Sequence, residues 1–317
     1  MSGLFYFRRL IHCFKYPNII FMVLNQINSL NFLFSYNGFI LISVFIFTIG
    51  LSIGSFLNVV IFRLPKNYSI VYPPSSCPNC GSEIKFYDNI PVLSYIILSG
   101  KCRKCGCKIS PVYPAVELIT ALIFYLLFVK YFYNAYFFYK INIFNIGYFS
   151  DHLLLQLDYF IAYSFFMFLL VPVAFIDLFH QIIPDILNIL TIISGFAFNV
   201  LLLHKSFLFP LYGLFGAGLF FYFIALFYEI IKKKEGLGGG DIKLIAGIGS
   251  FIGLQGAIFT IFTGSVFALM GFFIAYIFFN SYSNKKIPFG PFLSLAAVLY
   301  IFYGHNLVNM YIGLIKK

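Results

Sequence analysis

The sequence predicts an all-α polytopic membrane protein of about eight transmembrane helices, with a small cysteine-rich loop domain between the first two. Of its 317 residues, 61% are hydrophobic and only 10% are charged, whereas soluble domains carry roughly 25% charged residues. Apolar runs long enough to cross a bilayer recur along the chain. A soluble core cannot hold so much apolar surface, so the lipid bilayer is the expected solvent of this protein.

The net charge of +11 raises the question of nucleic-acid binding. The basic residues do not form one continuous patch, however. They fall in short gaps between apolar runs, as expected where Lys and Arg hold loops on the cytoplasmic side of a membrane. We therefore expect no nucleic-acid partner. No cleavable signal peptide is expected either, because the first apolar stretches are long and lack a cleavage site with small residues.

Eight apolar runs approach the roughly 20 residues that a helix needs to cross the hydrocarbon. The first, residues 38–62, is expected to be the first transmembrane helix. The others lie in a transmembrane domain of residues 114–317 and cover 114–133, 155–176, 186–203, 207–231, 242–253, 254–279 and 289–315. The run 242–253 is too short to cross alone and needs a tilt or a few of the residues that follow it.

Basic loops set the expected orientation. The interval 63–113 carries seven Lys or Arg, the interval 232–243 carries four, and the interval 280–288 carries two. With eight spans these loops and the short turn 177–185 share one side of the membrane, which the positive-inside rule makes cytoplasmic. Both termini are then expected on the opposite side.

The first 37 residues disagree with this orientation. Arg8, Arg9 and Lys15 would lie on the outer side, against the positive-inside rule. Residues 1–37 are therefore expected to be an N-terminal extension of the membrane domain: an interfacial helix, an added span, or a stretch upstream of the true start.

Two C-x2-C knuckles, Cys77-Pro-Asn-Cys80 and Cys102-Arg-Lys-Cys105, lie in the interval 63–113 with 21 residues between them. A pair of such turns supplies the four tetrahedral thiolates that Zn(II) prefers, and the spacing is close to that of zinc ribbons. We expect residues 63–113 to be a cytoplasmic zinc-binding domain, with a closed four-thiolate site that serves folding rather than catalysis. The alternative is a set of free or redox-active thiols.

Two further cysteines stand outside these knuckles. Cys107 lies two residues beyond the second knuckle and could compete as a metal ligand. Cys13 stands alone and is expected to be an ordinary apolar residue. A reducing cytoplasm argues against disulfides in the loop.

Carboxylates are rare in this chain, which has only ten Asp and Glu. A carboxylate in or at the edge of a span costs ~2.5–3.5 kcal/mol on insertion scales and indicates a function by default. Asp177 ends an apolar run, Asp185 follows directly after Pro184, and Asp241 ends the glycine-rich stretch that begins at Gly236. All three lie at the same expected boundary of the membrane, so they could meet in space.

Neighbouring carboxylates share one proton, because two cannot ionise easily side by side. The ionised partner can take a proton from water while the protonated partner polarises a peptide carbonyl, which is the chemistry of aspartic proteases. Glycines before Asp241 let the backbone approach a substrate strand. The candidate supporting residues of such a site are Gly238, Gly240, Lys243 and Asp185.

Structural roles are alternatives at each of these positions. Asp185 and Asp241 both directly precede an apolar helix and could cap its N-terminus; for Asp185 capping is the favoured interpretation. Asp177 could end its helix in contact with the basic loops, and His180 is expected to be an interfacial turn residue rather than a ligand. The glycine run does not fit a dinucleotide-binding loop, because no strand precedes it.

Several motifs follow one another between about residues 50 and 295. They are Gly54-Ser-Phe-Leu-Asn58 with Arg63-Leu-Pro65, the two cysteine knuckles, Asp88-Asn-Ile-Pro91, Gly100-Lys-Cys102, Tyr113-Pro-Ala-Val-Glu117, Ile176-Asp177 with Pro184-Asp185, Glu235-Gly236-x-Gly238-x-Gly240-Asp241-x-Lys243, and Pro288-Phe-Gly-Pro291. Each motif is a modest signal alone. In this order they resemble the bacterial type IV prepilin peptidases, also called prepilin leader peptidase/N-methyltransferases, a family of intramembrane aspartic proteases.

The resemblance implies an aspartic endopeptidase of the bacterial inner membrane that cleaves the short basic leader of type IV prepilins and type II secretion pseudopilins on the cytoplasmic side. It assigns the catalytic pair to Asp177 and Asp241, which are 64 positions apart. It also implies N-methylation of the new N-terminal residue, with S-adenosylmethionine as the methyl donor. Gly100 matches a family glycine linked to that second activity, and Glu117 is a further candidate.

Three other functions compete with this one. A presenilin-like or archaeal preflagellin-type protease shares the Gly-x-Gly-Asp pattern, but the cysteine loop argues against both. A proton-coupled transporter predicts acids near the bilayer midplane, whereas these lie at one edge. A zinc-stabilised assembly scaffold without catalysis would tolerate Asp→Asn changes at Asp177 and Asp241.

Overall fold

The computed structural model describes residues 35–141, 146–233, 238–278 and 288–315. These ranges are built from helices and contain no β-strand, so the predicted all-α class is confirmed. Six of the described helices are long and apolar enough to cross a membrane, and a shorter apolar helix follows them. The expectations for Cys13 and for almost all of the N-terminal extension fall outside the described residues.

The helices α3 (Tyr36–Arg63) and α5 (Val112–Ile141) form a close pair. A glycine on α3 permits the close approach, because a Cβ added at Gly50 would lie 2.6 Å from the Cα of Ala121. Small residues at helix contacts are typical of membrane proteins, where close packing rather than the hydrophobic effect drives helix association. This pair carries the loop domain, since α3 leads into it and α5 leads out of it.

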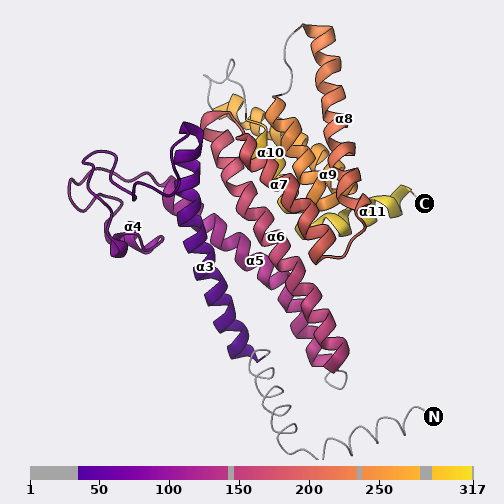
Figure 1. Cartoon of the computed structure of the whole chain (residues 1–317), viewed down its shortest axis with the longest axis horizontal. Coiled ribbons are helices and arrows are strands. Elements are labelled where there is room, and N and C mark those ends of the chain that lie inside the picture. Colours follow the sequence, from indigo (N-terminus) through magenta and orange to yellow (C-terminus); the bar gives the residue numbers. More distant parts are fainter. Residues whose placement is uncertain (1–34, 142–145, 234–237, 279–287, 316–317) are drawn as a thin grey trace, which may run out of the picture.

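The long helix α6 (Ile146–His180) packs against α3, α5 and several later helices, as Figure 1 shows. Phe166 near its middle is fully buried and stacks on Phe251 with ring centroids 4.3 Å apart. Asp177 lies near the C-terminal end of α6, where other helices surround it.

Two helices follow α6. α7 (Asp185–Ala197) continues without a gap into the short π-helix η3 (Phe198–Leu202), and together they cover the predicted run 186–203. α8 (Leu208–Lys232) then returns in the opposite direction and packs along much of α9. The predicted run 207–231 therefore corresponds to one helix.

The 40-residue helix α9 (Gly239–Phe278) is broken at Gly253. Gly253 has φ 76° and ψ 175°, a backbone conformation that residues with a side chain rarely adopt. A Cβ at this position would also lie 2.5 Å from the ring of Phe209. The break divides α9 into two helical parts, which correspond to the predicted runs 242–253 and 254–279.

The last predicted run, 289–315, forms three consecutive elements: α10 (Gly290–Leu299), the π-helix η4 (Tyr300–Gly304) and α11 (His305–Ile315). The ammonium of Lys130 on α5 donates hydrogen bonds to two backbone carbonyls of η4. These hydrogen bonds give the ammonium of Lys130 partners inside the protein, as a lipid environment requires.

One end of the bundle collects the ends of many helices, and it lies at the top of Figure 1. The C-termini of α3, α6 and α8 and the N-termini of α7, α9 and α10 all lie there. A hydrogen bond joins α6 to α10, and an ion pair joins α7 to α9. We call this the loop end. The arrangement agrees with the prediction that the basic loops share one side of the membrane.

Residues 64–111 form a lobe beside the loop end of α3, at the left of Figure 1. The lobe contains two short 3-10 helices, η1 (Leu64–Lys66) and η2 (Phe86–Asp88), and the five-residue helix α4 (Leu93–Ile97). Two isolated antiparallel β-bridges close its two cysteine knuckles. We call this region the cysteine lobe.

Candidate active site and cysteine cluster

Asp177 is buried at the loop end of α6, with 5% of its surface exposed. Its Oδ2 accepts a hydrogen bond of 2.8 Å from the backbone N–H of Gly290, the first residue of α10. Unpaired N–H groups and the dipole at a helix N-terminus stabilise an anion, so α10 favours negative charge on Asp177. A glycine is needed at this contact, because a Cβ at Gly290 would lie 2.7 Å from Oδ2.

Asp241 lies in the first turn of α9, which begins at Gly239. It is therefore inside the helix rather than at the capping position that was the structural alternative. Its Oδ1 is buried and has no hydrogen-bond partner among the described residues. Buried carboxylate oxygens are normally paired, so this oxygen is an acceptor available to a proton or a ligand.

Contacts around the turn after α6 bring the two aspartates together. The carbonyl of Gly240 accepts a hydrogen bond of 3.5 Å from the side-chain amide of Asn188 on α7. A Cβ added at Gly240 would lie 3.1 Å from the Cβ of Ile183 in that turn. Asp177 lies three residues before the end of α6, and Asp241 lies in the first turn of α9. Both predicted catalytic residues therefore lie at the loop end, and their pairing stays a prediction.

Asp185 does not cap α7, so the favoured structural interpretation of this residue is wrong. The N-cap of α7 is Pro184, and Asp185 is the first residue of the helix. Its carboxylate forms an ion pair of 2.7 Å with the ammonium of Lys243, and these side chains are 63% and 53% exposed. The pair joins α7 to α9, and exposed ion pairs of this kind add little stability.

Two residues of the site were not predicted as members. Gly290 stands in the motif Pro288-Phe-Gly-Pro291, and a proline in the first turn is a helix-start signal that could have placed this N–H at a helix N-terminus. Asn188 is a buried amide in an otherwise apolar run, and polar residues inside a membrane span usually have a function or a partner. His180 is exposed at the end of α6, as expected for a turn residue.

The four cysteines of the predicted metal site lie together in the cysteine lobe. The sulfur atoms of Cys77, Cys80, Cys102 and Cys105 all lie within 4.8 Å of one another, and those of Cys77 and Cys105 are 3.8 Å apart. Four sulfurs bound tetrahedrally at about 2.3 Å from Zn(II) would be separated by roughly 3.8 Å. The donor set and its spacing therefore fit a tetrahedral metal ion.

Backbone N–H groups of the knuckles favour the thiolate form of Cys77 and Cys105, whereas burial and the neighbouring thiols of Cys77 and Cys105 raise the pKa of Cys102. Hydrogen bonds from the N–H groups of Cys80 and Asn79 lower the pKa of the Cys77 thiol. The N–H of Cys107 contributes most to lowering the pKa of the Cys105 thiol to about 6. The sulfur of Cys107 itself lies 3.4 Å from that of Cys77, so its role as a competing ligand stays open.

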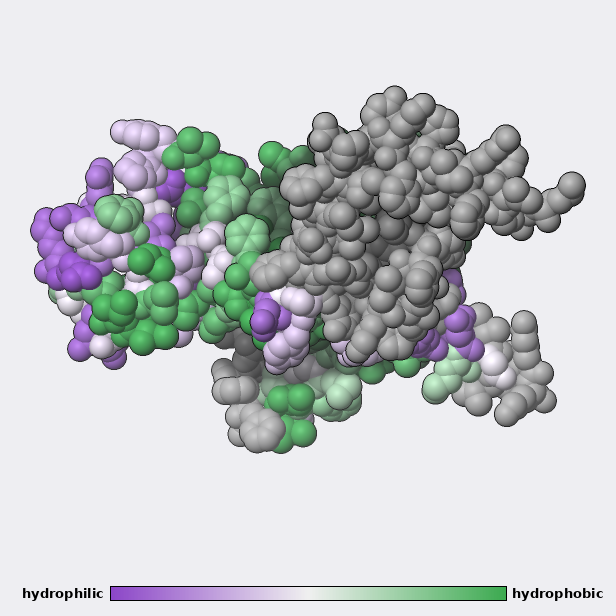
Figure 2. Space-filling model, turned by 90° about the horizontal axis from the view of Figure 1, so that it is seen from below, coloured by the Kyte–Doolittle hydropathy of each residue, from purple (hydrophilic) through white to green (hydrophobic). Residues whose placement is uncertain are grey.

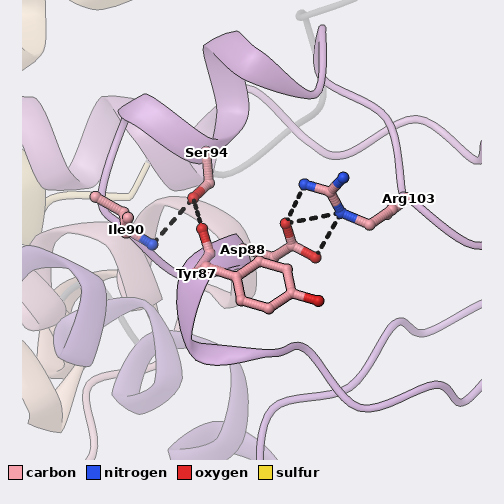
Figure 3. Close-up of polar contacts among 5 residues, drawn as sticks. All are labelled: Tyr87, Asp88, Ile90, Ser94 and Arg103. Atoms are coloured by element: carbon pink, nitrogen blue, oxygen red, sulfur yellow. Dashed lines mark hydrogen bonds and ion pairs between the residues drawn. The ribbon is translucent and has the colours of Figure 1, made fainter.

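An ion pair joins the two halves of the cysteine lobe, as Figure 3 shows. The guanidinium of Arg103 donates hydrogen bonds of 2.6–2.9 Å to both carboxylate oxygens of Asp88. Arg103 lies in the second knuckle and Asp88 ends η2. The hydrogen bond from Arg103 lowers the pKa of Asp88, which keeps the pair charged at neutral pH.

Gly100 and Glu117, the candidates for methyl transfer, lie at opposite ends of α4. The Oε2 of Glu117 accepts a hydrogen bond of 2.7 Å from the N–H of Val92, the residue before α4. Gly100 follows the helix with φ +66°, and a Cβ there would lie 3.0 Å from the ring of Tyr95. Both residues therefore support α4, and none of the contacts in the described part of the chain joins them to the aspartates.

Comparison with known families matches two segments of the chain. The bacterial peptidase A24 N-terminal domain matches residues 48–131, and the type IV leader peptidase family matches residues 164–276. The first segment contains the cysteine lobe, and the second contains both aspartates. No solved structure matches the chain.

Curated relatives resemble the chain over most of its length. The prepilin leader peptidase/N-methyltransferase of Pseudomonas aeruginosa is 31% identical over 83% of this chain and 91% of the relative. The protein of that name from Aeromonas salmonicida is 29% identical over 85% and 94%, respectively. The one from Myxococcus xanthus is 36% identical over 67% of this chain and 56% of the relative.

Proposed function

We propose a reaction for this chain from one premise: the chain belongs to the type IV leader peptidase family. The reaction is cleavage of the basic leader peptide of type IV prepilins and type II secretion pseudopilins, with Asp177 and Asp241 as the catalytic pair. One observation carries the proposal. Two carboxylates far apart in the sequence lie at the same end of the bundle, Asp177 at the end of α6 and Asp241 at the start of α9.

The pair works by sharing one proton between two carboxyl groups. Asp177 is the better candidate for the ionised partner, since the N–H of Gly290 donates to it. The ionised carboxylate takes a proton from water, whose oxygen bonds to the carbonyl carbon of the scissile peptide. The protonated partner gives its proton to the carbonyl oxygen. The carboxyl group that took the proton from water then gives it to the amide nitrogen as the C–N bond breaks. A hydroxyl of the tetrahedral intermediate returns its proton to the other carboxylate, so the pair again holds one proton.

The position of the pair suits a substrate that is part soluble and part membrane-bound. Lys and Arg are concentrated in the loops at the loop end, which we assign to the cytoplasmic side of the bacterial inner membrane. A prepilin would keep its apolar segment in the bilayer and present the bond to be cut at the cytoplasmic edge. The glycines before Asp241 would let the extended substrate backbone approach, and the exposed Asp185–Lys243 pair lies beside this path.

The chain divides by role in this proposal. Residues 38–62 are the first transmembrane helix, residues 63–113 form a cytoplasmic zinc-binding domain, and residues 114–317 form the protease domain. Zinc would be held by the thiolates of the four clustered cysteines, whose spacing fits its tetrahedral preference. A closed set of four protein ligands stabilises the fold and leaves no position for a substrate.

Methylation of the new N-terminal amine is proposed from the name of the relatives. S-adenosylmethionine would supply the methyl group. Glu117 already accepts the N–H of Val92, and Gly100 is covered by Tyr95, so the folding of α4 accounts for both residues. We therefore derive no step through the methyl donor.

The test is the mass of the product that purified protein in lipid nanodiscs forms from a prepilin, with and without S-adenosylmethionine. We expect loss of the leader in both reactions, and a further gain of one methyl group only with S-adenosylmethionine. An unchanged prepilin mass would overturn the protease assignment and favour a scaffold role. Cleavage without methyl gain would reject the second activity alone.

A further inference from the structure

The short helix α4 presents an apolar stripe outside the transmembrane bundle. Leu93, Ile96 and Ile97 are 56%, 64% and 72% exposed. Positions i, i+3 and i+4 of a helix lie on one face, so these three side chains form a continuous stripe. Large apolar side chains gathered on one face and open to solvent mark a surface that binds something.

The opposite side of α4 is fixed to the protein, so the stripe has a defined direction. Ser94 is buried; its hydroxyl donates to the carbonyl of Tyr87 and accepts from the N–H of Ile90, as Figure 3 shows. The N–H of Val92 donates to Glu117 on α5. These bonds hold α4 against the lobe and against the transmembrane pair, and they leave the apolar stripe facing away from both.

The cysteine lobe around α4 is basic. Residues 64–111 contain six Lys or Arg and two Asp or Glu. Arg103 is paired with Asp88, and the remaining five basic side chains, all lysines, form no ion pair within the described residues. They are Lys66, Lys85, Lys101, Lys104 and Lys108. An apolar stripe in a lobe rich in lysine is the pattern of a segment that lies in the interface of an anionic membrane.

The attachment of the cysteine lobe to two transmembrane helices places the lobe close to the membrane surface. It leaves α3 at Arg63 and returns into α5 at Val112, so both of its ends are attached to helices at the loop end. Figure 1 places α4 on the lower edge of the lobe, towards the side on which α3 runs back to its N-terminus. Seen from below in Figure 2, this end of the molecule shows hydrophobic surface beside hydrophilic surface.

We propose that α4 is an interfacial anchor: Leu93, Ile96 and Ile97 insert among the lipid acyl chains at the loop end, and the lysines of the cysteine lobe bind anionic phospholipid headgroups. The lobe then lies flat on the bilayer beside α3 and does not extend into solution. Each lysine near an anionic surface adds attraction that fades within a Debye length, so the anchoring requires anionic lipid and weakens with salt.

Charge argues for a lipid surface over a protein partner. The leader peptides that the proposed function assigns as substrate are basic and would be repelled by the lysines of the lobe. A phospholipid leaflet supplies both an apolar layer and negative charge at the depth where α4 is held. The anchoring is independent of the aspartate pair, so its test does not require a cleavage assay.

The chain contains no tryptophan, so one introduced tryptophan reports on a single position. The experiment places Ile97→Trp, or Ile96→Trp as a second reporter, in the full-length protein. The control is Val71→Trp in the same lobe, at a residue that is 85% exposed and lies outside α4. Each variant is reconstituted in nanodiscs with a tryptophan-free scaffold protein, made of phosphatidylethanolamine and phosphatidylglycerol with or without bromine on the acyl chains, and tryptophan emission is recorded.

We expect the α4 reporters to show blue-shifted emission and to lose most of their intensity to brominated lipid, with much weaker quenching at position 71. Nanodiscs of phosphatidylcholine alone, high salt, or the variant with Lys101, Lys104 and Lys108 all changed to Gln should reduce the quenching. Equal quenching at positions 71 and 97, or none at either, would overturn the proposal. Emission that turns blue only when a prepilin is added would also overturn it, and would make α4 a substrate-docking face.

Discussion

The contact between Gly290 and Asp177 gives the sharpest prediction about the catalytic site. A Cβ in Gly290→Ala would lie 2.7 Å from the Oδ2 of Asp177 and 3.2 Å from its Cγ. These distances are too short for a non-bonded contact, so the carboxylate or the start of α10 must move. The hydrogen bond of 2.8 Å from the backbone N–H at this position would be lost or lengthened with that movement.

The size of the effect follows from that hydrogen bond. A hydrogen bond to a charged group contributes about 1.5–3 kcal/mol. If it holds Asp177 in its reactive position, its loss raises the barrier by a similar amount, and ~1.4 kcal/mol corresponds to tenfold in rate. We therefore expect kcat/KM for prepilin cleavage to fall about 10- to 150-fold in Gly290→Ala.

The assay is leader cleavage by purified variants in nanodiscs, at several substrate concentrations. Gly313→Ala is the matched control, because a Cβ at this helical glycine meets nothing within 4 Å and should leave cleavage unchanged. Thermal melting of both variants separates a local effect from unfolding. Full kcat/KM in a folded Gly290→Ala protein would refute the assigned role of this contact.

Three further predictions concern an exposed ion pair, a partly buried lysine and the cysteine cluster. Asp185→Asn and Lys243→Met should show a coupling energy below about 1 kcal/mol in a double-mutant cycle of thermal stability, because the ion pair is exposed. Loss of cleavage in a folded Asp185→Asn protein would instead make Asp185 a catalytic residue. Burial lowers the pKa of Lys205 to about 8. Between about pH 8 and about pH 10.4, Lys205 is neutral in the folded protein and still protonated in the unfolded chain, so the stability of the folded protein should rise with pH. Lys205→Met should flatten this part of the plot of melting temperature against pH. Parallel plots for the variant and the unchanged protein would contradict the assignment. Cys102→Ser should lose bound zinc by elemental analysis while Cys107→Ser retains one zinc per chain, and the reverse result would make Cys107 the ligand.

The sequence predicted the helices well because lipid imposes a simple rule. Long apolar runs must be helical in a bilayer, and each of the eight runs is helical in the described residues. The rule says nothing about breaks inside a run. Gly253 divides α9 through a backbone conformation that the local sequence does not indicate. The π-helices η3 and η4 likewise interrupt the helical runs that begin with α7 and α10.

The charged members of the candidate site and the glycines before Asp241 were predicted, whereas Asn188 and Gly290 were not. Asp177 and Asp241 stood out because carboxylates at a membrane boundary are costly. The capping interpretation of Asp185 was wrong, because local helix rules cannot anticipate that Lys243, 58 positions away, takes its carboxylate. Gly290 contributes a backbone N–H rather than a side chain, and the carboxylate that accepts its hydrogen bond, that of Asp177, is 113 positions away in the sequence.

The most direct test of the central claim compares Asp177→Asn, Asp241→Asn and the double variant in single-turnover cleavage of a prepilin. Groups that act as one unit are not additive, so a pair sharing one proton fails when either member is removed. We predict that all three folded variants fall to the same uncatalysed background. Cleavage that persists in either single variant, or a double variant slower than the slower single variant, would contradict the shared-proton pair.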